Sequence, residues 1–206
     1  MKRRRLWTGL AAATVVAAGA AVWAVLSQPA TTSDSEAKSA ARAASEAQTL
    51  LSAGLMQSQY QDFSGAATTF KRVVALDPRN KIAWYNLGVI AQRGGKKADA
   101  RAAYDKALKI DPLFDSALFN EALLLKSSEP DRSIKLLKRV VAHNSKASTA
   151  YLHLGEALAK KGRDDEAQDA FGRAVAVDPK LLSLVPEAFQ DSASPSPSTS
   201  QAGTTE

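Results

Sequence analysis

Hydrophobic and small residues recur among polar ones at a fixed spacing along the middle of the chain. Two segments, LGVIAQRGGKKADARAAYDKALKIDP (87–112) and LGEALAKKGRDDEAQDAFGRAVAVDP (154–179), align without a gap and share Leu-Gly, a turn Gly, then Ala-x3-aromatic-x2-Ala-x4-Pro. Residues 54–78 fill the same frame 34 positions before the first segment. This pattern predicts pairs of helices in which small residues let the axes approach and one large residue fills the gap. A proline ends each pair because it cannot continue the helix.

A worn copy of this unit lies between the two segments. LKRVVAHNS (137–145) repeats FKRVVALDP (70–78) at a distance of 67 residues, but it has lost the final Asp-Pro. Its turn, KSSEPD, is one residue shorter, which makes this copy 33 residues long. Without the terminating proline, we expect the regular angle of the stack to deviate near residues 143–146. The other departures from the frame are Glu121-Ala122 in place of Leu-Gly, and Ser133, Leu137 and Val140 in place of Ala, aromatic and Ala.

The unit resembles the tetratricopeptide repeat (TPR), a 34-residue helix-turn-helix with the pattern W-x2-L-G-x2-Y, A-x3-F and P. Trp84-x2-Leu87-Gly88 matches the opening of that pattern literally, whereas Ala91 and Leu158 stand at the usual Tyr position. The resemblance covers about two-thirds of the chain. It implies an all-α TPR solenoid, which supports itself from three repeats upward. We place the four repeats at 47–80, 81–114, 115–147 and 148–181.

The resemblance also implies where a partner would bind, because the first helix of each TPR lines a concave groove. Position five of the repeats gives an apolar row, and position six gives a polar row of Asn86, Asn120 and His153. Such rows suit an extended peptide or an amphipathic helix, although the aromatic residues could instead serve only packing between repeats. The expected groove residues are Ile82, Tyr85, Asn86, Val89, Phe119, Asn120, Leu123, Leu152, His153 and Glu156.

The N-terminal residues have the pattern of a membrane segment. Residues 6–26 carry no charge over 21 positions, which is enough for a helix of roughly 31 Å, about the thickness of a bilayer's hydrocarbon core. The basic cluster at 1–5 predicts a cytoplasmic N-terminus, with everything after residue 26 outside the cytoplasm. A cleaved signal peptide with Ala18-Gly19-Ala20 as its site is the alternative. We favour the uncleaved anchor because the apolar run exceeds the usual signal core.

The remaining segments are expected to flank the repeats. Residues 27–46 predict a linker and a helical lead-in, with Ser33 and Glu36 as a capping box at the start of a long helix. Residues 182–190 are apolar enough to form a short cap on the last repeat. A poor cap there could be shared with a partner or support weak self-association. Residues 191–206 cannot bury a core and are expected to be disordered.

Charge and composition narrow the function further. The net charge is +6, with four of the positive charges in residues 2–5, while residues 81–147 carry thirteen basic and seven acidic groups. This is not a basic face that tracks nucleic acid, so no nucleic-acid partner is expected. The absence of cysteine excludes disulfides, thiol catalysis and thiolate metal sites. The two histidines, His143 and His153, have no matching constellation, so no catalytic residue, cofactor or metal site is predicted.

These patterns together lead us to expect a non-enzymatic TPR scaffold in the cell membrane. It would span the membrane once, display its repeats outside the cytoplasm and bind a protein or peptide. A secreted or periplasmic TPR chaperone or assembly factor is one alternative, and an accessory subunit of a cell-envelope complex is another. A clamp for the C-terminal carboxylates of cytosolic chaperones is disfavoured. Leu51, Leu55, Ser116 and Asn120 stand at positions that hold other, mostly basic, residues in that subfamily.

Overall fold

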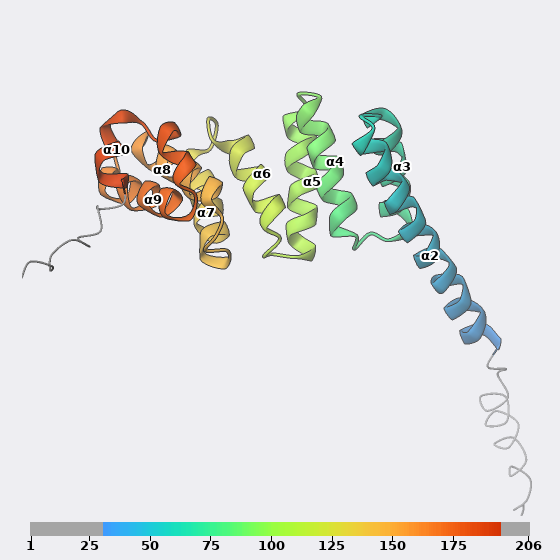
Figure 1. Ribbon diagram of the computed structural model, residues 1–206. Helices are drawn as coiled ribbons and strands as arrows, with labels where there is room; N and C mark the ends of the chain where they lie inside the picture. The colour runs from blue at the N-terminus through green and yellow to red at the C-terminus, as the bar shows by residue number, and fades with distance from the viewer. Residues whose placement is uncertain (1–30, 195–206) are drawn as a thin grey trace, which may run out of the picture. The chain divides into compact units, whose positions relative to one another are not determined.

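The computed structural model describes residues 31–194, with side chains from residue 34 onward, and every regular element in that range is helical (Figure 1). The predicted cytoplasmic stub 1–5, the membrane segment 6–26 and residues 195–206 of the tail lie outside the described residues. Over residues 31–194, we find no helix with the length and apolar character needed to cross a bilayer. The helices are α2 Thr31–Gln59, α3 Phe63–Leu76, α4 Lys81–Arg93, α5 Lys97–Ile110, α6 Asp115–Leu125, α7 Pro130–His143, α8 Ser148–Ala159, α9 Asp164–Val177, the 3-10 helix η1 Pro179–Leu184 and α10 Glu187–Ala193.

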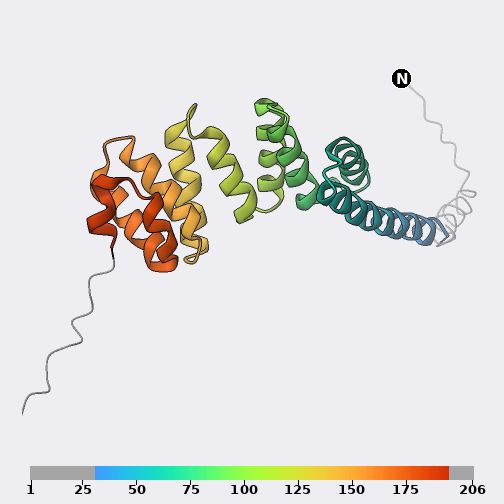
Figure 2. The same ribbon diagram turned by 45° about the horizontal axis from the view of Figure 1, so that its top comes forward.

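The chain divides into two units, residues 1–42 and 43–206. In the first unit, the described side chains 34–42 of α2 are all exposed. The start of α2 differs from the expected one, because the helix already includes Thr31 and Ser33 therefore lies inside it and not at its N-cap. In the second unit, consecutive helices pack against each other from α3 to α10, as two views of the ribbon show (Figures 1 and 2). The expected all-α TPR fold is therefore confirmed for the repeat domain.

Each regular repeat is closed by an aromatic ring on a glycine. A Cβ atom added at Gly88 would lie 2.5 Å from Cε1 of Tyr104, and one at Gly155 would lie 2.5 Å from Cε1 of Phe171. In the first repeat the same pair is Gly54 and Phe70, at 2.7 Å. All three rings are fully buried. The glycine of each pair is thus required by contact, since any larger residue would push the aromatic ring off the first helix.

The third repeat solves the same packing problem with different residues. Ala122 replaces the glycine and Leu137 replaces the aromatic ring, and both side chains are fully buried. A larger residue on the first helix is therefore matched by a smaller one on the second. Ser133 takes the place of the alanine that lies between the helices elsewhere. Its buried hydroxyl group donates a hydrogen bond to the carbonyl oxygen of Ala122 over 2.8 Å, so this polar group has a partner in the core.

Glu121 is the unusual residue of this repeat, because its side chain is completely buried where the second and fourth repeats have leucine. Its Oε1 accepts a hydrogen bond from Arg132, which also bonds Asp105 at 2.9 Å. Its Oε2 has no hydrogen-bond partner among the described residues. Burial raises the pKa of Glu121, and the nearby Asp105 carboxylate adds to that rise, while Arg132 opposes both. The third repeat therefore holds a buried carboxylate that depends on one guanidinium.

The junction after the worn repeat keeps the backbone of the regular ones. The residue after α7, Asn144, has φ −126° and ψ 92°, and its Oδ1 accepts the N–H of Lys146 over 3.0 Å. Asp111 makes the same turn after α5, with φ −134° and ψ 98°, and its Oδ1 accepts the N–H of Leu113 over 3.0 Å. The expected irregularity near residues 143–146 is therefore absent from the turn itself. The carbonyl oxygen of an asparagine replaces the carboxylate oxygen, and the proline is not needed.

The C-terminal cap is longer than the predicted 182–190. It comprises η1 and α10, and α10 continues to Ala193, which is 4% exposed. The ring of Phe189 lies 5.2 Å from the ring of Phe171, and Val185, between η1 and α10, is buried. Residues 191–193, expected in the disordered tail, are helical because Ala193 belongs to the hydrophobic core. Leu184 is the large apolar side chain left exposed in this cap.

The contact between ring and glycine generates a first prediction. Gly88→Ala should destabilise the full-length chain by about 1–3 kcal/mol, because the new methyl group overlaps Tyr104. The measurement is urea unfolding followed by circular dichroism. Combining Gly88→Ala with Tyr104→Leu copies the pair of the third repeat and should recover part of the lost stability.

Gly172→Ala is the matched control, because no heavy atom lies within 4 Å of its added Cβ. It should stabilise by about 0.5–1 kcal/mol. Equal effects at Gly88 and Gly172 would contradict this account.

The buried carboxylate generates a second prediction. Arg132→Met should destabilise the protein by about 3 kcal/mol at neutral pH, because Glu121 is left charged and buried without a cation. A carboxyl whose pKa is raised by folding lowers stability only above its unfolded pKa, so this cost should shrink as the pH falls towards 4. Urea midpoints across that range measure it. The double variant Glu121→Leu/Arg132→Met should be close to wild type, and a cost for Arg132→Met independent of pH would refute the explanation.

Candidate functional site

The predicted groove residues lie on the first helices of repeats two to four, α4, α6 and α8, and we call this surface the groove face. On α4, residues 82, 85, 86 and 89 follow the spacing i, i+3, i+4, i+7 and so share one side of the helix. The start of α4 is fixed by Asn80, whose side chain accepts the N–H of Ala83 over 3.0 Å. The groove face is therefore a property of helix register, which the sequence pattern already fixes.

Repeats two and three are joined on this face by a single side-chain bond. The amide of Asn120 donates to the hydroxyl oxygen of Tyr85 over 2.9 Å. The Tyr85 ring lies 5.4 Å from the ring of Phe114, which holds it against the start of α6. Burial raises the pKa of Tyr85, and the Asn120 bond offsets part of that rise. The apolar row and the polar row are thus coupled here, and Phe114, absent from the predicted set, fixes the tyrosine.

Repeats three and four are joined by a charged cluster. Nδ1 of His153 lies 2.9 Å from Oε2 of Glu156, and Lys126, the residue after α6, binds the same carboxylate. Burial would raise the pKa of Glu156, but the bonds from Lys126 and His153 outweigh it and lower the pKa. The Phe119 ring lies 5.7 Å from the His153 ring. Sequence reasoning had no signal for the contact of Lys126, because Lys126 and Glu156 are 30 positions apart and meet only when the repeats stack.

The groove residues differ in how much surface they offer a partner. Ile82 is the most exposed, at 38%, whereas Tyr85, Val89, Phe119 and Leu123 are half-buried. Leu152 is 4% exposed, so it is a core residue and not a contact surface. The physical reason is that it packs in the same hydrophobic cluster as the second helix of its repeat. The apolar row is therefore interrupted at α8, while the part on α4 and α6 remains partly open.

The polar row keeps hydrogen-bonding capacity. The amide of Asn86 donates to the carbonyl of Ile82 in its own helix over 2.8 Å, and the amide of Asn120 donates to Tyr85. Within residues 34–194, no donor reaches the Oδ1 atom of either asparagine. Each of these oxygens can accept up to two hydrogen bonds. Two acceptors one repeat apart are therefore available to the backbone N–H groups of a bound segment.

In the part of the chain that the structure describes, no arrangement of side chains matches a metal-binding or catalytic site. No group of three or more His, Asp or Glu side chains there could hold a metal ion. His143 has a structural contact, because its Nδ1 lies 2.9 Å from Oδ1 of Asp115 and ties the end of α7 to the start of α6. Its place in the last turn of α7 also favours a cation near the helix C-terminus.

The chain is similar to known proteins in both sequence and fold. The sequence model of the tetratricopeptide repeat family matches residues 59–113 and 123–181, more than half of the chain. The protein belongs to the tetratricopeptide repeat family. The TPR fold is typically a non-catalytic scaffold that binds proteins or peptides, and this is the coarse function that membership supports.

Solved TPR structures are similar to this chain. A crystal structure of MamA has 25% identity, covers 66% of this chain and 75% of its own, and superposes with a TM-score of 0.59. YrrB, described as a TPR protein with an unusual peptide-binding site, has 21% identity, coverage of 75% and 78%, and a TM-score of 0.62. PilW, a type IV pilus biogenesis factor, has 21% identity, coverage of 66% and 64%, and a TM-score of 0.59. YrrB and PilW share the fold at this identity, and their functions are their own.

One curated protein is similar over a shorter stretch. Protein O-mannosyl-transferase Tmtc3 of Drosophila melanogaster is 27% identical over 110 residues, which is 52% of this chain. The aligned part is 12% of that protein's length. The similarity is therefore confined to a small part of a much larger protein, and its transferase activity is not carried over to this chain.

Proposed function

We propose that this TPR protein is a non-enzymatic scaffold that holds a protein or peptide segment on its groove face. The observation that carries the proposal is the pair of open amide oxygens, Oδ1 of Asn86 and Oδ1 of Asn120, beside the exposed side chain of Ile82. A bound segment needs acceptors for its backbone N–H groups and an apolar surface for its anchors, and this part of the face offers both. Membership of a family of binding scaffolds supports the same reading.

The rest of the face has a structural role in this proposal. Tyr85 and the cluster of Lys126, His153 and Glu156 are satisfied by contacts between repeats, so they hold α4, α6 and α8 at fixed spacing. A surface held in place by such contacts loses little conformational entropy when a partner binds. Both readings of the aromatic row therefore apply: Tyr85 and Phe119 pack between repeats and also form the floor on which a partner rests.

A photo-crosslinking experiment tests the groove. Benzoylphenylalanine in place of Ile82, in the full-length chain in native membranes, should capture a partner on illumination. The triple variant Asn86→Ala/Asn120→Ala/His153→Ala should lose most of that capture, because the polar row is removed. A matched triple variant of exposed residues on α7 and α9, Lys135→Ala/Gln168→Ala/Asp169→Ala, should retain it. If the captured partners are the same for both triple variants, the groove proposal is wrong, while the family assignment stands.

We also propose that residues 6–26 anchor the chain in the cell membrane as one span, with the repeats outside the cytoplasm. The support is the sequence itself, an uncharged stretch of 21 residues after a basic cluster. A secreted or periplasmic TPR chaperone or assembly factor, released by cleavage, is the competing proposal. Either form could serve as an accessory subunit of a cell-envelope complex.

The anchor generates a prediction about the mature protein. Mass spectrometry of the chain purified from membranes should give Met1 as its first residue, and carbonate washing should not release it. Val16→Arg, which places a charge at the centre of the apolar run, should release the protein because a central arginine costs about 2.5–3.5 kcal/mol on insertion scales. A first residue near Ala21 would instead establish cleavage and overturn the anchor.

A further inference from the structure

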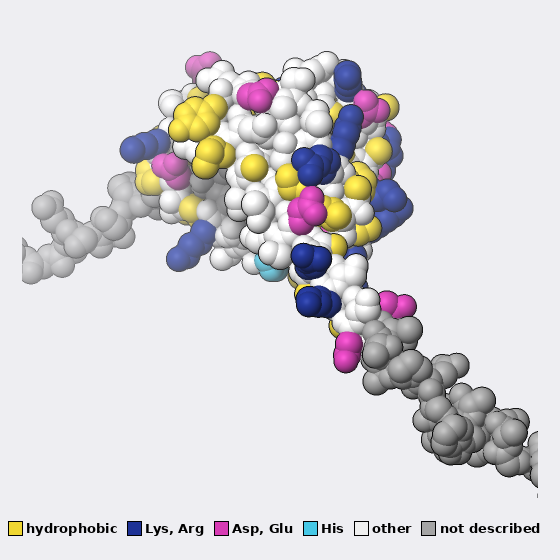
Figure 3. Space-filling model, turned by 90° about the vertical axis from the view of Figure 1, so that its right-hand side faces the viewer, with side chains coloured by type: hydrophobic (Ala, Val, Ile, Leu, Met, Phe, Trp, Pro, Cys, Tyr) yellow, Lys and Arg dark blue, Asp and Glu magenta, His cyan; other side chains and the backbone are white. Residues whose placement is uncertain are grey.

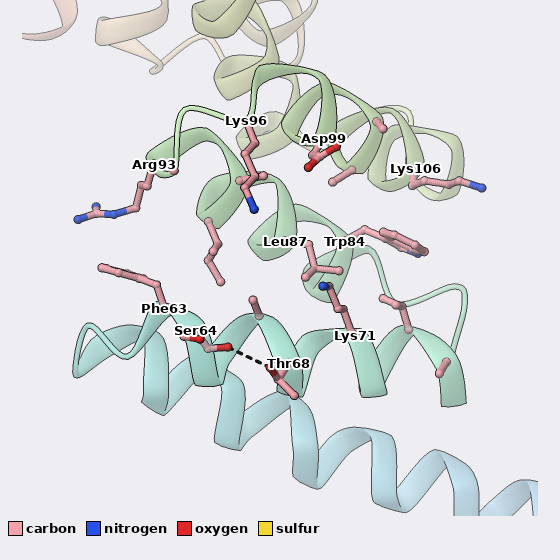
Figure 4. Close-up of a pocket in the computed structure, with 18 residues that line it drawn as sticks. Phe63, Ser64, Thr68, Lys71, Trp84, Leu87, Arg93, Lys96, Asp99 and Lys106 are labelled. Carbon is pink, nitrogen blue, oxygen red and sulfur yellow. Dashed lines mark hydrogen bonds between the residues drawn. The ribbon is translucent and has the colours of Figure 1, made fainter.

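A cleft lies between α3, α4 and α5, on the side of α4 away from the groove face. Its volume is about 1070 Å³, at the upper end of ordinary ligand-binding pockets. Residues 84, 87 and 91 of α4 line it, and by helix periodicity these lie opposite residues 82, 85 and 89 of the groove face. Figure 4 shows Leu87 and Trp84 facing this space, with α3 on one side and α5 on the other. The cleft is therefore distinct from the groove.

Equivalent positions at the other repeat junctions explain why this cleft is open. Between α7 and α9, Nζ of Lys138 binds Oε2 of Glu166 over 2.8 Å. Between α5 and α7, the same two positions hold Asp105 and Arg132, with the charges exchanged, and they bind over 2.9 Å. The neighbouring cavities at these two junctions measure only about 300 and 400 Å³. The two junctions that hold an ion pair between successive second helices therefore have smaller cavities than the cleft.

The first junction has the residues for such a pair but does not form it. The equivalent positions are Lys71 on α3 and Asp99 on α5, and both line the cleft without meeting within 4.0 Å. Alanines 67, 75, 102 and 103 line the walls that α3 and α5 contribute, while larger apolar side chains of α4 form the floor. Small residues on both walls let a further helix approach closely.

The rim of the cleft is strongly basic. Four cations line it, Lys71, Arg93, Lys96 and Lys106, against the single carboxylate of Asp99. None of the four forms an ion pair with another described residue. Two of them lie over aromatic rings at the ends of the cleft: Arg93 is 4.4 Å from the Phe63 ring, and Lys106 is 5.9 Å from the Trp84 ring. Lysines, arginines and hydrophobic side chains also lie interspersed on the surface seen from the α3 end (Figure 3).

We propose that this cleft binds an acidic amphipathic helix of a partner protein. An apolar floor of Leu87, Ile90 and Val74 takes the hydrophobic side of the helix, and the four rim cations take its acidic flanks. The cleft runs along α3 from residue 63 to residue 75, which is roughly 18 Å or three helical turns. Residues 195–206 offer one acidic residue and no large apolar one, and residues 1–30 offer no acidic residue, so neither segment has the composition of such a helix.

The test uses a probe helix and the full-length chain in nanodiscs of zwitterionic lipid. The probe is a fluorescent 16-residue helical peptide with leucines at i, i+3, i+4, i+7 and i+11 and glutamates on its flanks. Fluorescence anisotropy should show saturable binding, above that of empty nanodiscs, and weaker binding at higher salt. Two control peptides, one with lysines for the glutamates and one with serines for the leucines, should not bind. Binding of the serine peptide as tight as the leucine peptide would reveal a simple polyanion surface and overturn the proposal.

Matched variants locate the binding. Lys71→Glu/Lys106→Glu should weaken it at least about tenfold, because two rim charges are reversed. Lys109→Glu/Lys135→Glu changes the net charge equally at exposed positions outside the cleft, and should stay within about twofold of wild type. Ala102→Trp fills the cleft without altering charge and should abolish binding with helix content unchanged. Equal affinity of the two double-lysine variants for the probe, or no binding of the probe by the wild type, would overturn the proposal. The triple variant Asn86→Ala/Asn120→Ala/His153→Ala should bind the probe normally. A failure of the cleft proposal can therefore be told apart from a failure of the groove proposal.

Discussion

The contact of one large buried side chain with the facing helix of its repeat is the constraint on which the rest of the structure depends. Tyr104 on Gly88, Phe171 on Gly155 and Phe70 on Gly54 set the separation of the two helices in three repeats. That separation sets how closely the first helix of each repeat lies against the second. A hydrophobic core is packed to near-crystalline density, so the pair of positions tolerates change only if both members change together. The third repeat satisfies this rule with Ala122 and Leu137.

The third repeat shows how far the motif can drift while the fold is kept. Its lost Asp-Pro is replaced by Asn144, whose Oδ1 accepts the same backbone N–H as the aspartates of the other turns. Its lost leucine is replaced by Glu121, which needs Arg132 as a counter-charge. A substitution in the turn changes stability little, because the exposed backbone N–H group requires only a hydrogen-bond acceptor. A substitution at the core position changes stability strongly, because a buried carboxylate must keep its cation.

Contacts between repeats give the two sides of the stack different characters. On the groove face, a hydrogen bond from Asn120 to Tyr85 and the Lys126–Glu156 contact join successive first helices. Between second helices, ion pairs at equivalent positions join α5 to α7 and α7 to α9, whereas Lys71 and Asp99 form no such pair beside the larger cleft between α3, α4 and α5. The thirteen basic groups noted in residues 81–147 acquire meaning here. Most acids of that region form ion pairs, and three of the cations that form none, Arg93, Lys96 and Lys106, line the cleft.

The spacing of residues along the chain was enough to predict the all-α TPR fold and its helix pairs, because that spacing encodes contacts within one repeat. It also identified the third repeat as irregular. The tertiary structure alone decided that Leu152 is buried, that Phe114 supports Tyr85, and that the cap extends to Ala193. It also revealed the cleft beside Lys71. These features depend on how closely neighbouring repeats approach, and that distance follows from side chains about 30 residues apart that no local pattern relates.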